Sequence, residues 1–292
     1  MTEAAETPAG AVPKTVLYTC TNLDFDQIFP PAVRTPGVEY VLFTDRRPRR
    51  LGAWEWRPLP PQTQGLSPTL TNRYTKFFPH RLFPEAEITI YVDANTLLIG
   101  DLGPLIAEFI ASKAEIGLFR HTKRSDIFSE FDFCQEVGRI PPQDVEKGRA
   151  QLQRYLDEGL PKAHAFTENA IIFRRHGNPA LERAMDLWWE ELETYTKRDQ
   201  LSLPYVLHKT GIRAKIWDWN YTEENPYFHR YLHRHSFLHD LNVAMKNKRY
   251  YNRVYYHLFG SMLFAWHGLL KRLLPRGARR GALAPVRPRQ RQ

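Results

Sequence analysis

Apolar residues along this chain gather in short runs, and longer polar or amphipathic stretches separate them. Seven of the runs are four to seven residues long and rich in β-branched or aromatic residues, which is typical of buried β-strands. These predicted strands cover residues 14–19, 38–44, 54–59, 88–93, 115–119, 170–173 and 212–217.

Helical patterns lie between the predicted strands. Ser67-Pro68 predicts an N-cap with Pro in the first turn, and that helix is expected to continue until Pro79 disturbs it. The stretch 127–161 is expected to form an insertion over the sheet edge, helical in its second half. The remaining helix signals are Pro104, a C-terminal cap at Gly159, Asn178-Pro179 and the segment from Asp199 to Gly211. This alternation predicts an α/β fold with a mixed, mostly parallel sheet flanked by helices.

The length and composition are those of an ordinary globular protein, with 292 residues of which 42% are apolar and 25% charged. We expect one α/β domain over residues 15–228. The flanking segments are predicted to be a disordered leader at 1–14, a helical extension at 229–275 and a basic disordered tail at 276–292.

The net charge of +9 is unevenly distributed. The segment from His229 to the end holds 14 Lys and Arg against one acidic residue, whereas the first 228 residues hold 27 against 31. This asymmetry predicts a tail that contacts phosphates on a membrane surface or a nucleic acid, while the body has another role. A nucleic acid is the less expected partner, because the body is acidic and carries no nucleic-acid-binding signature.

From Tyr256 onward, apolar residues recur at helical spacing and basic residues follow them. That pattern is typical of a helix lying in an anionic membrane interface, and a terminal helix packed on the domain is the alternative. The apolar positions are Phe259, Met262, Leu263, Trp266, Leu270 and Leu273.

The expected compartment follows from the cysteines and the ends of the chain. Cys20 and Cys134 cannot form a disulfide framework. The first residues lack the basic flank and apolar run of a signal peptide, and the most apolar window, 258–270, is too short to span a bilayer. We expect a cytoplasmic protein that can associate with the inner face of the membrane through its tail.

The first candidate for chemistry is the end of the predicted strand 88–93. Open α/β sheets bind ligands outside the carboxyl ends of their strands, and Asp93 and Asn95 follow this strand. Their oxygens are hard ligands of the kind that Mg²⁺ or Mn²⁺ prefers. An ordinary turn is the alternative interpretation of the same residues.

Arg73 and Lys76 form the second candidate, because three residues separate them on a predicted helix and they share a face. Two cations beside a metal would stabilise the charge that develops on a diphosphate leaving group. The alternative is a solvated basic face.

Two polar pairs follow later in the chain. Asp199-Gln200 begins a predicted helix, and Asp199 is interpreted either as an N-cap or as a carboxylate that orients sugar hydroxyls or accepts a proton. Glu168-Asn169 precedes the predicted strand 170–173, and it is interpreted either as a base with a binding amide or as a turn.

Together these segments resemble the glycosyltransferase-like domain of plant mucilage-related proteins and their bacterial relatives. The resemblance covers roughly Thr15 to Trp219. In chain order the segments that carry it are Asn72-Arg-Tyr-Thr-Lys76, Tyr91-Val-Asp-Ala-Asn95, Tyr155-Leu-Asp-Glu-Gly-Leu-Pro161, Glu168-Asn-Ala-Ile-Ile-Phe-Arg-Arg-His176, Trp188-Trp-Glu-Glu191 and Arg198-Asp-Gln-Leu-Ser202.

The resemblance implies a GT-A type fold, a nucleotide-sugar donor with a UDP-sugar as the expected one, and a polysaccharide or glycolipid acceptor. It also implies a divalent metal, Mn²⁺ or Mg²⁺, held by Asp93-Ala-Asn95, where an amide replaces the second carboxylate and weakens the expected affinity. A third metal ligand is expected among His229, His233 and His235, and His235 is the one we select. A phosphate-binding stripe and a surface helix are the alternative interpretations of these histidines.

The remaining roles that the resemblance implies concern the donor. The loop 19–24, which begins with Thr19, would hold the nucleoside together with Asp45. Arg73 and Lys76 would hold the diphosphate. The sugars would contact His121, Glu168, Asn169, Asp199 and Gln200. Some members of the family are described as alkaline ceramidases, so a lipid amidohydrolase and a catalytically inactive sugar-nucleotide-binding domain stay open as alternatives.

Overall fold

The computed structural model of the chain describes residues 13–22, 28–231, 250–252, 254, 262 and 265. Nearly all of the expected leader, the tail 276–292, the segment that carries His235 and most of the expected membrane helix lie outside these residues. No helix within the described ranges is both long and apolar enough to cross a bilayer.

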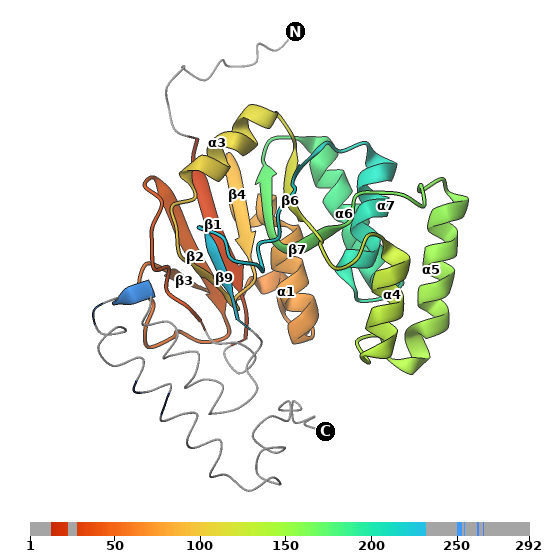
Figure 1. The fold of residues 1–292 in the computed structure, drawn as a ribbon, viewed down its shortest axis with the longest axis horizontal. Coiled ribbons are helices and arrows are strands. Elements are labelled where there is room, and N and C mark those ends of the chain that lie inside the picture. The colour runs from red at the N-terminus through yellow and green to blue at the C-terminus, as the bar shows by residue number, and fades with distance from the viewer. Residues whose placement is uncertain are drawn as a thin grey trace, which may run out of the picture.

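A seven-stranded sheet forms the centre of the domain (Figure 1). Its strand order is β3-β2-β1-β4-β7-β6-β8, and β7 is antiparallel to both of its neighbours while all other pairs are parallel. This arrangement confirms the mixed, mostly parallel sheet that the sequence predicts. The strands are β1 Thr15–Cys20, β2 Val38–Thr44, β3 Glu55–Pro58, β4 Ile88–Val92, β6 Ile116–Arg120, β7 Thr167–Arg175 and β8 Ala214–Trp217.

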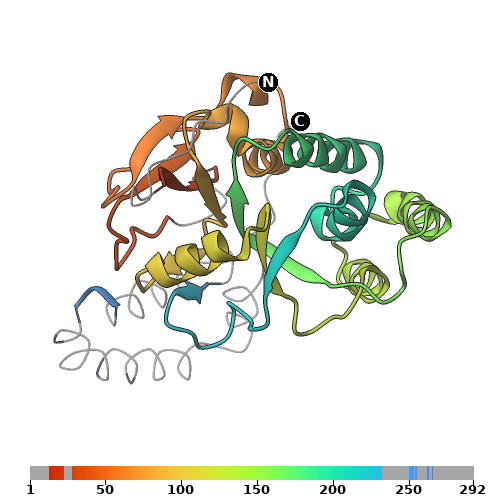
Figure 2. The same ribbon diagram turned by 90° about the horizontal axis from the view of Figure 1, so that it is seen from above.

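Helices cover both faces of the sheet, as the view in Figure 2 shows. Helix α3 packs on one face through Leu105 and Phe109, which join the apolar side chains of that face. Helices α1, α6 and α7 cover the other face, where Phe77 stacks on Trp188 with ring centroids 3.8 Å apart. The helices are α1 Pro68–Phe77, α2 Pro79–Leu82, α3 Gly103–Ser112, α4 Ile127–Glu136, α5 Val145–Asp157, α6 Pro179–Thr194 and α7 Asp199–Thr210.

The local start signals of the helices act as the sequence predicts. The hydroxyl of Ser67 accepts the backbone N–H of Leu70 at the start of α1, and the side chain of Asn178 accepts that of Ala180 at the start of α6. Each cap satisfies a backbone donor that has no partner inside its helix. Gly159 follows α5 with a φ of +94°, the left-handed conformation expected of a glycine after a helix.

Most predicted strands are within one or two residues of the observed ones, and two larger differences concern the region of the site. The stretch 127–161 is helical in its first half as well as its second, because Asp126 caps α4 by accepting two backbone N–H groups. Strand β7 is longer than predicted and contains Glu168 and Asn169, which therefore lie in the strand rather than in a turn before it. The apolar pattern missed these positions because their side chains are polar.

A second, two-stranded sheet lies beside the main one. It pairs β5, Thr96–Leu98, with β9, Phe228–Arg230, in antiparallel register. Strand β9 runs across residue 228, so the described fold continues past the expected end of the catalytic domain to Tyr231, whose backbone N–H donates to the carbonyl of Asn95. This pairing brings Arg230 beside the end of β4.

Candidate active site

A cavity of about 600 Å³ lies at the edge of the sheet where β4 ends. The backbone N–H of Asp93, just after β4, donates to the carbonyl of Ala170 in β7 at 2.8 Å. Because β7 is antiparallel, its first residues lie at the same edge as the last residues of β4. This topology brings Asp93, Glu168 and Asn169 into one cavity wall, and α1 and α7 supply the opposite side chains.

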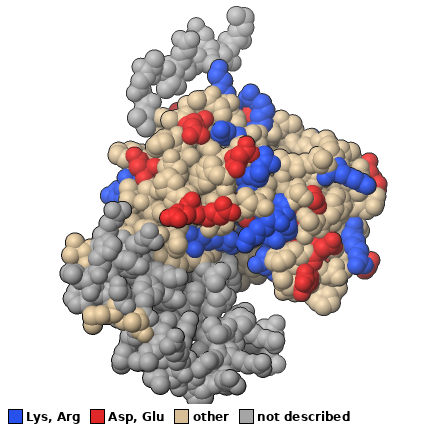
Figure 3. Space-filling model, viewed as in Figure 1, with Lys and Arg blue, Asp and Glu red and all other residues tan. Residues whose placement is uncertain are grey.

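A smaller cavity of about 250 Å³ adjoins the first. The two share Thr69, Arg73, Asp93 and Arg198, and the smaller one reaches Thr21 and Asn22 after β1. Both signs of charge line the large cavity, and Figure 3 shows acidic and basic side chains gathered side by side near the middle of the face seen in Figure 1. The size of the large cavity is in the range usual for small-molecule sites.

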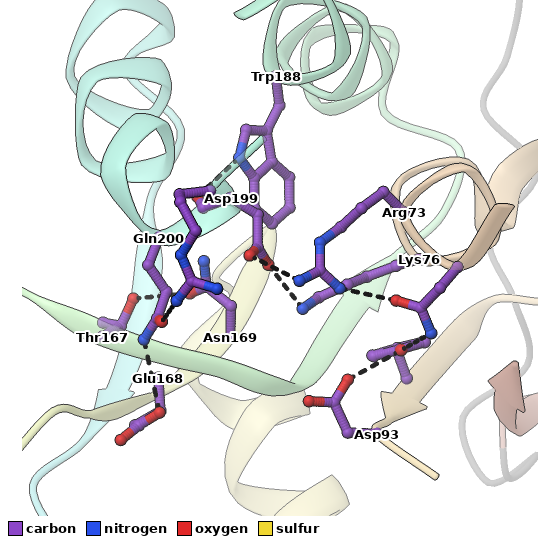
Figure 4. Close-up of polar contacts among 12 residues, drawn as sticks. Arg73, Lys76, Asp93, Thr167, Glu168, Asn169, Trp188, Asp199 and Gln200 are labelled. Atoms are coloured by element: carbon purple, nitrogen blue, oxygen red, sulfur yellow. Dashed lines mark hydrogen bonds and ion pairs between the residues drawn. The ribbon is translucent and has the colours of Figure 1, made fainter. Parts of the chain in front are cut away.

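The carboxylate of Asp199 lies between two cations (Figure 4). Its two oxygens are 3.1 Å from Arg73 Nη2 and 2.8 Å from Lys76 Nζ. Burial alone would raise the pKa of Asp199, but the charges of Arg73 and Lys76 outweigh it and hold the pKa well below its usual range. Asp199 is the first residue of α7, and Arg198 occupies the N-cap position, so the N-cap interpretation of Asp199 is wrong.

A chain of hydrogen bonds orients the carboxylate of Asp93. The hydroxyl of Tyr91 donates to Asp93 Oδ1 at 2.9 Å, and Asn72 Nδ2 donates to that hydroxyl at 2.9 Å and to the carbonyl of Cys20 at 2.7 Å. These contacts tie the ends of β1 and β4 to α1. They fix the Asp93 carboxylate. Because Asp93 lines both cavities, it can contact a ligand that spans them.

Glu168 has a different environment from Asp199. Its side chain is 14% exposed, and Glu168 Oε1 lies 3.2 Å from His121 Nε2. His121 Nδ1 accepts the backbone N–H groups of Lys123 and Arg124, so in the neutral ring Nε2 carries the hydrogen and donates it to Glu168.

The pKa values agree with this assignment. Burial and then the charge of Arg124 lower the pKa of His121 to about 4, so its ring is neutral at pH 7. Burial raises the pKa of Glu168, and the nearby carboxylates of Glu130 and Asp93 add to the rise while Arg230 and Arg124 oppose it. A carboxyl group with a raised pKa beside a neutral imidazole is suited to proton transfer.

Two uncharged donors that belong to residues lining the large cavity are buried and have no hydrogen-bond partners among the described residues. They are Asn169 Nδ2 and the hydroxyl of Tyr221. The side chains are 3% and 0% exposed. Buried donors of this kind are costly unless a partner satisfies them, so this part of the cavity suits a ligand rich in oxygen acceptors.

The structure brings most of the predicted site residues together. Those that line the large cavity are Arg73, Lys76, Asp93, Glu168, Asn169, Asp199 and Gln200. His121 lies behind Glu168 and contacts it. Thr19, Asp45 and Asn95 line neither cavity, and His235 lies outside the described residues.

The lining residues that sequence reasoning missed include the polar side chains of Arg139, Arg198, Tyr221 and Arg230. Arg198 stands beside Asp199 in a segment that the sequence singled out, so its position was available as a signal. Tyr221 and Arg230 reach the cavity only through the loop after β8 and the pairing of β9 with β5, and no local pattern reports such a contact.

The predicted metal ligands lie in a tight turn. Asn95 is buried, and its Nδ2 donates to the carbonyl of Tyr231 at 2.8 Å, while Asn95 Oδ1 has no hydrogen-bond partner among the residues described. The oxygens of Asp93 and Asn95 are hard donors of the kind that Mg²⁺ or Mn²⁺ takes, and of the two residues only Asp93 lines the cavities. Within the part of the chain that the structure describes there is no group of three His, Cys, Asp or Glu that could hold a metal ion.

A mostly parallel α/β sheet with a cation-lined cavity at the carboxyl ends of its strands defines the class of α/β proteins that bind their ligands at that edge. Residues 50–228 match the family model described as TOD1/MUCI70, glycosyltransferase-like domain, and the chain belongs to that family. This match confirms the resemblance that the sequence motifs indicate.

Two proteins of Arabidopsis thaliana are similar to the chain. One is named probable hexosyltransferase MUCI70, with 28% identity over 148 residues that cover 48% of this chain and 25% of the relative. The other is named alkaline ceramidase TOD1, with 26% identity over 178 residues that cover 57% of this chain and 38% of the relative. The chain thus matches well under half the length of each.

Among solved structures, mouse xyloside xylosyltransferase 1 in its apo form is similar to 70% of this chain, with 9% identity and a TM-score of 0.43. The similarity covers 85% of that chain.

Proposed function

We propose that this protein is a glycosyltransferase that moves a sugar from a nucleotide-sugar donor to a polysaccharide or glycolipid acceptor. The observation that carries the proposal is a pair of buried donors without partners in the described part of the chain, Asn169 Nδ2 and the Tyr221 hydroxyl, on residues that line the same cavity as Asp93 and Glu168. Hydroxyl-rich sugars supply the acceptors that these groups need. The glycosyltransferase-like family supports the same reaction class.

The two adjoining cavities support a placement for the donor. The nucleoside would lie in the smaller cavity beside Thr21 and Asn22, because that cavity opens at the end of β1. The diphosphate would lie where the cavities meet, at Arg73 and Arg198, because these guanidinium groups line both. The sugar would then reach Asn169 in the larger cavity. A UDP-sugar is the donor that we propose to test first.

A divalent metal, Mn²⁺ or Mg²⁺, is part of the proposal. The residues of this chain that would hold it are Asp93 and Asn95, and a bound ion would neutralise charge on the departing diphosphate. Mg²⁺ commonly takes one or two protein carboxylates and completes its shell with substrate phosphates and water, which suits a site with one carboxylate and one amide oxygen.

The reaction breaks the bond between the anomeric carbon and the diphosphate oxygen and joins that carbon to an acceptor oxygen. The acceptor hydroxyl must lose its proton, and we assign that proton to Glu168. His121 keeps the Glu168 carboxylate oriented by donating from Nε2. Asp199 cannot take this role, because Arg73 and Lys76 keep it ionised and hold both of its oxygens.

The test is a thermal-shift screen of UDP, GDP and ADP, each with and without MnCl₂, followed by turnover of the matching nucleotide sugars. A ligand that binds only the folded state raises its apparent stability. We expect a metal-dependent shift with one nucleotide. Asp93→Ala should abolish that shift while the protein stays folded, and Asp157→Ala, a surface carboxylate on α5, should preserve it.

The screen also separates the alternatives. Binding without turnover would indicate an inactive sugar-nucleotide-binding domain. A wild-type protein that binds no nucleotide, but releases fatty acid from ceramide, would contradict the proposal and favour the activity in the name of the relative TOD1.

We also propose that the basic C-terminal tail places the enzyme on an anionic membrane surface near its acceptor. The charge pattern of the sequence supports this, with 14 Lys and Arg from His229 onward. Deleting residues 256–292 should abolish sedimentation with phosphatidylserine vesicles at low salt. Sedimentation that persists after the deletion would place the membrane contact elsewhere.

A further inference from the structure

Six polar side chains beside the large cavity form a closed ring of contacts. On one side, Glu168 has two contacts. Its Oε1 lies 3.2 Å from His121 Nε2, and its Oε2 lies 3.5 Å from Gln200 Nε2. On the other side, Glu130 accepts from the guanidinium groups of Arg124 and Arg198. In order the ring is Arg198, Glu130, Arg124, His121, Glu168 and Gln200, and Arg124 is joined to His121 by its backbone N–H, which donates to Nδ1 at 3.0 Å.

The ring joins elements that are far apart in the sequence. Glu130 comes from α4, Arg198 and Gln200 come from the start of α7, and Glu168 comes from β7. His121 and Arg124 lie in the loop between β6 and α4. Glu130 thus connects helix α4 to Arg198 in the cavity wall, although Glu130 does not itself line the cavity.

Glu130 is the member of the ring that is fully buried, with 0% of its side chain exposed. Its carboxylate accepts from three side chains, because the thiol of Cys134 also donates to Glu130 Oε1 at 3.1 Å. A buried carboxylate with this many donors is held in one place, and it holds its donors in turn. Arg198 and Arg124 each gain a fixed position from the same group.

We propose that Glu130 is a positioning residue, which fixes Arg198 at the junction of the two cavities and, through Arg124 and His121, fixes the carboxylate of Glu168. The naming of Glu168 as the base rests on the proposed function, whereas the ring itself does not. The helix α4 is then part of the active site rather than a cover over the sheet edge.

The charges around Glu168 predict the direction in which its pKa changes when a member of the ring is replaced. The groups that face Glu168 are His121 and Arg124 from the loop after β6, Glu130 from α4, Arg230 from β9, Asp93 after β4 and Gln200 from α7. If Glu130 loses its charge, the cation of Arg124 is no longer compensated, so the pKa of Glu168 should fall. If Arg124 loses its charge, the pKa of Glu168 should rise.

The experiment compares Glu130→Gln and Arg124→Gln with the wild type in the full chain. The pKa of Glu168 is measured by NMR of ¹³C-labelled glutamate, with Glu168→Gln used to assign the signal. We expect the pKa of Glu168 to fall in Glu130→Gln and to rise in Arg124→Gln. The affinity for UDP with MnCl₂, measured by calorimetry, should fall about tenfold in Glu130→Gln because Arg198 is released.

Glu191→Gln is the matched control. Glu191 is also a buried carboxylate on a helix, where it accepts from Arg154 and from the hydroxyl of Tyr155, but it lines neither cavity. Its substitution should leave the pKa of Glu168 and the affinity for UDP unchanged.

The outcomes separate the ring from the proposed function. A Glu168 pKa that stays constant in both variants, or shifts in the same direction in both, would overturn the ring proposal. If Glu130→Gln does not fold, Arg124→Gln still tests the direction of the change in the pKa of Glu168, because the Arg124 side chain is partly exposed. A wild type that binds none of the nucleotides contradicts the proposed function, while the pKa of Glu168 still tests the ring.

Discussion

Two carboxylates line the large cavity, and their surroundings differ. Asp199 lies between two cations and is 3% exposed. Glu168 contacts a neutral imidazole and an amide, and its side chain is 14% exposed. The pKa of Asp199 is lowered by its partners, whereas the pKa of Glu168 is raised by burial.

The difference shows that neighbours assign the role of a carboxylate. Paired cations keep Asp199 charged and immobile, so it organises the site by neutralising Arg73 and Lys76. Glu168 contacts neutral partners, so no directly paired cation holds it in the ionised form, and it is the carboxylate suited to take up a proton. Both residues were interpreted from the sequence as possible proton acceptors, and only their contacts separate them.

The largest expected effect on stability comes from removing the charge of Asp199. Asp199→Asn removes the charge that balances Arg73 and Lys76, and Lys76 is only 2% exposed. Loss of one partner from a buried ion pair costs about 3–5 kcal/mol, so the free energy of unfolding in urea should fall by about that amount.

The control for this variant is Asp186→Asn. Asp186 pairs with Arg81 on the surface, where both side chains are 46% exposed, so its loss should cost roughly 0–1 kcal/mol. Equal losses in the two variants would show that the pairing around Asp199 contributes no more than a surface contact.

The next largest effect is expected on turnover and not on stability or donor binding. Glu168→Gln keeps the shape of the side chain but removes its ability to take a proton, so turnover should fall by about 10²–10⁴-fold. Affinity for the donor nucleotide and the midpoint of urea unfolding should stay close to the wild type. A Glu168→Gln variant with full turnover would remove Glu168 from the reaction.

A smaller effect is the pH dependence of stability, which should have opposite signs for the two carboxylates. Asp199 has a lowered folded-state pKa, so its contribution is present above its unfolded pKa of about 3.9 and is lost as the pH falls below it. Glu168 has a raised folded-state pKa, so its contribution is present below about 4.3 and is lost as the pH rises through the folded value.

Urea unfolding between pH 3 and pH 8 measures this difference. As the pH rises, Asp199→Asn should become less stable relative to the wild type, and Glu168→Gln should become more stable relative to it. If the stability of both variants relative to the wild type changed with pH in the same direction, the contrast between Asp199 and Glu168 would be contradicted.

Local patterns predicted much of the fold because they report short-range structure. The boundaries of β2, Val38–Thr44, match the predicted run, and α1 begins after Ser67 as its cap indicates. The site was only partly predictable. Lys76 and Asp199 are 123 residues apart in the chain, so their ion pair depends on how α1 and α7 pack. The sequence offered both residues as candidates but not as partners.

The smallest expected effect concerns Asp45, which the family resemblance assigned to the nucleoside. Asp45 follows β2, has a 31% exposed side chain 3.7 Å from Arg46, and lines neither cavity. Asp45→Asn should change the affinity for UDP by less than about twofold and the stability by less than about 0.5 kcal/mol, because substitutions at such surface positions usually have little effect.

Asn22→Ala is the comparison that gives this result its meaning. Asn22 lines the smaller cavity, so its loss should weaken UDP binding several-fold more than Asp45→Asn does. If Asp45→Asn has the larger effect, the nucleoside lies over the end of β2 rather than at the end of β1. Because β2 lies on the side of β1 away from β4, the nucleoside would then lie beyond the smaller cavity, and the donor would extend further along the sheet edge than the two cavities do.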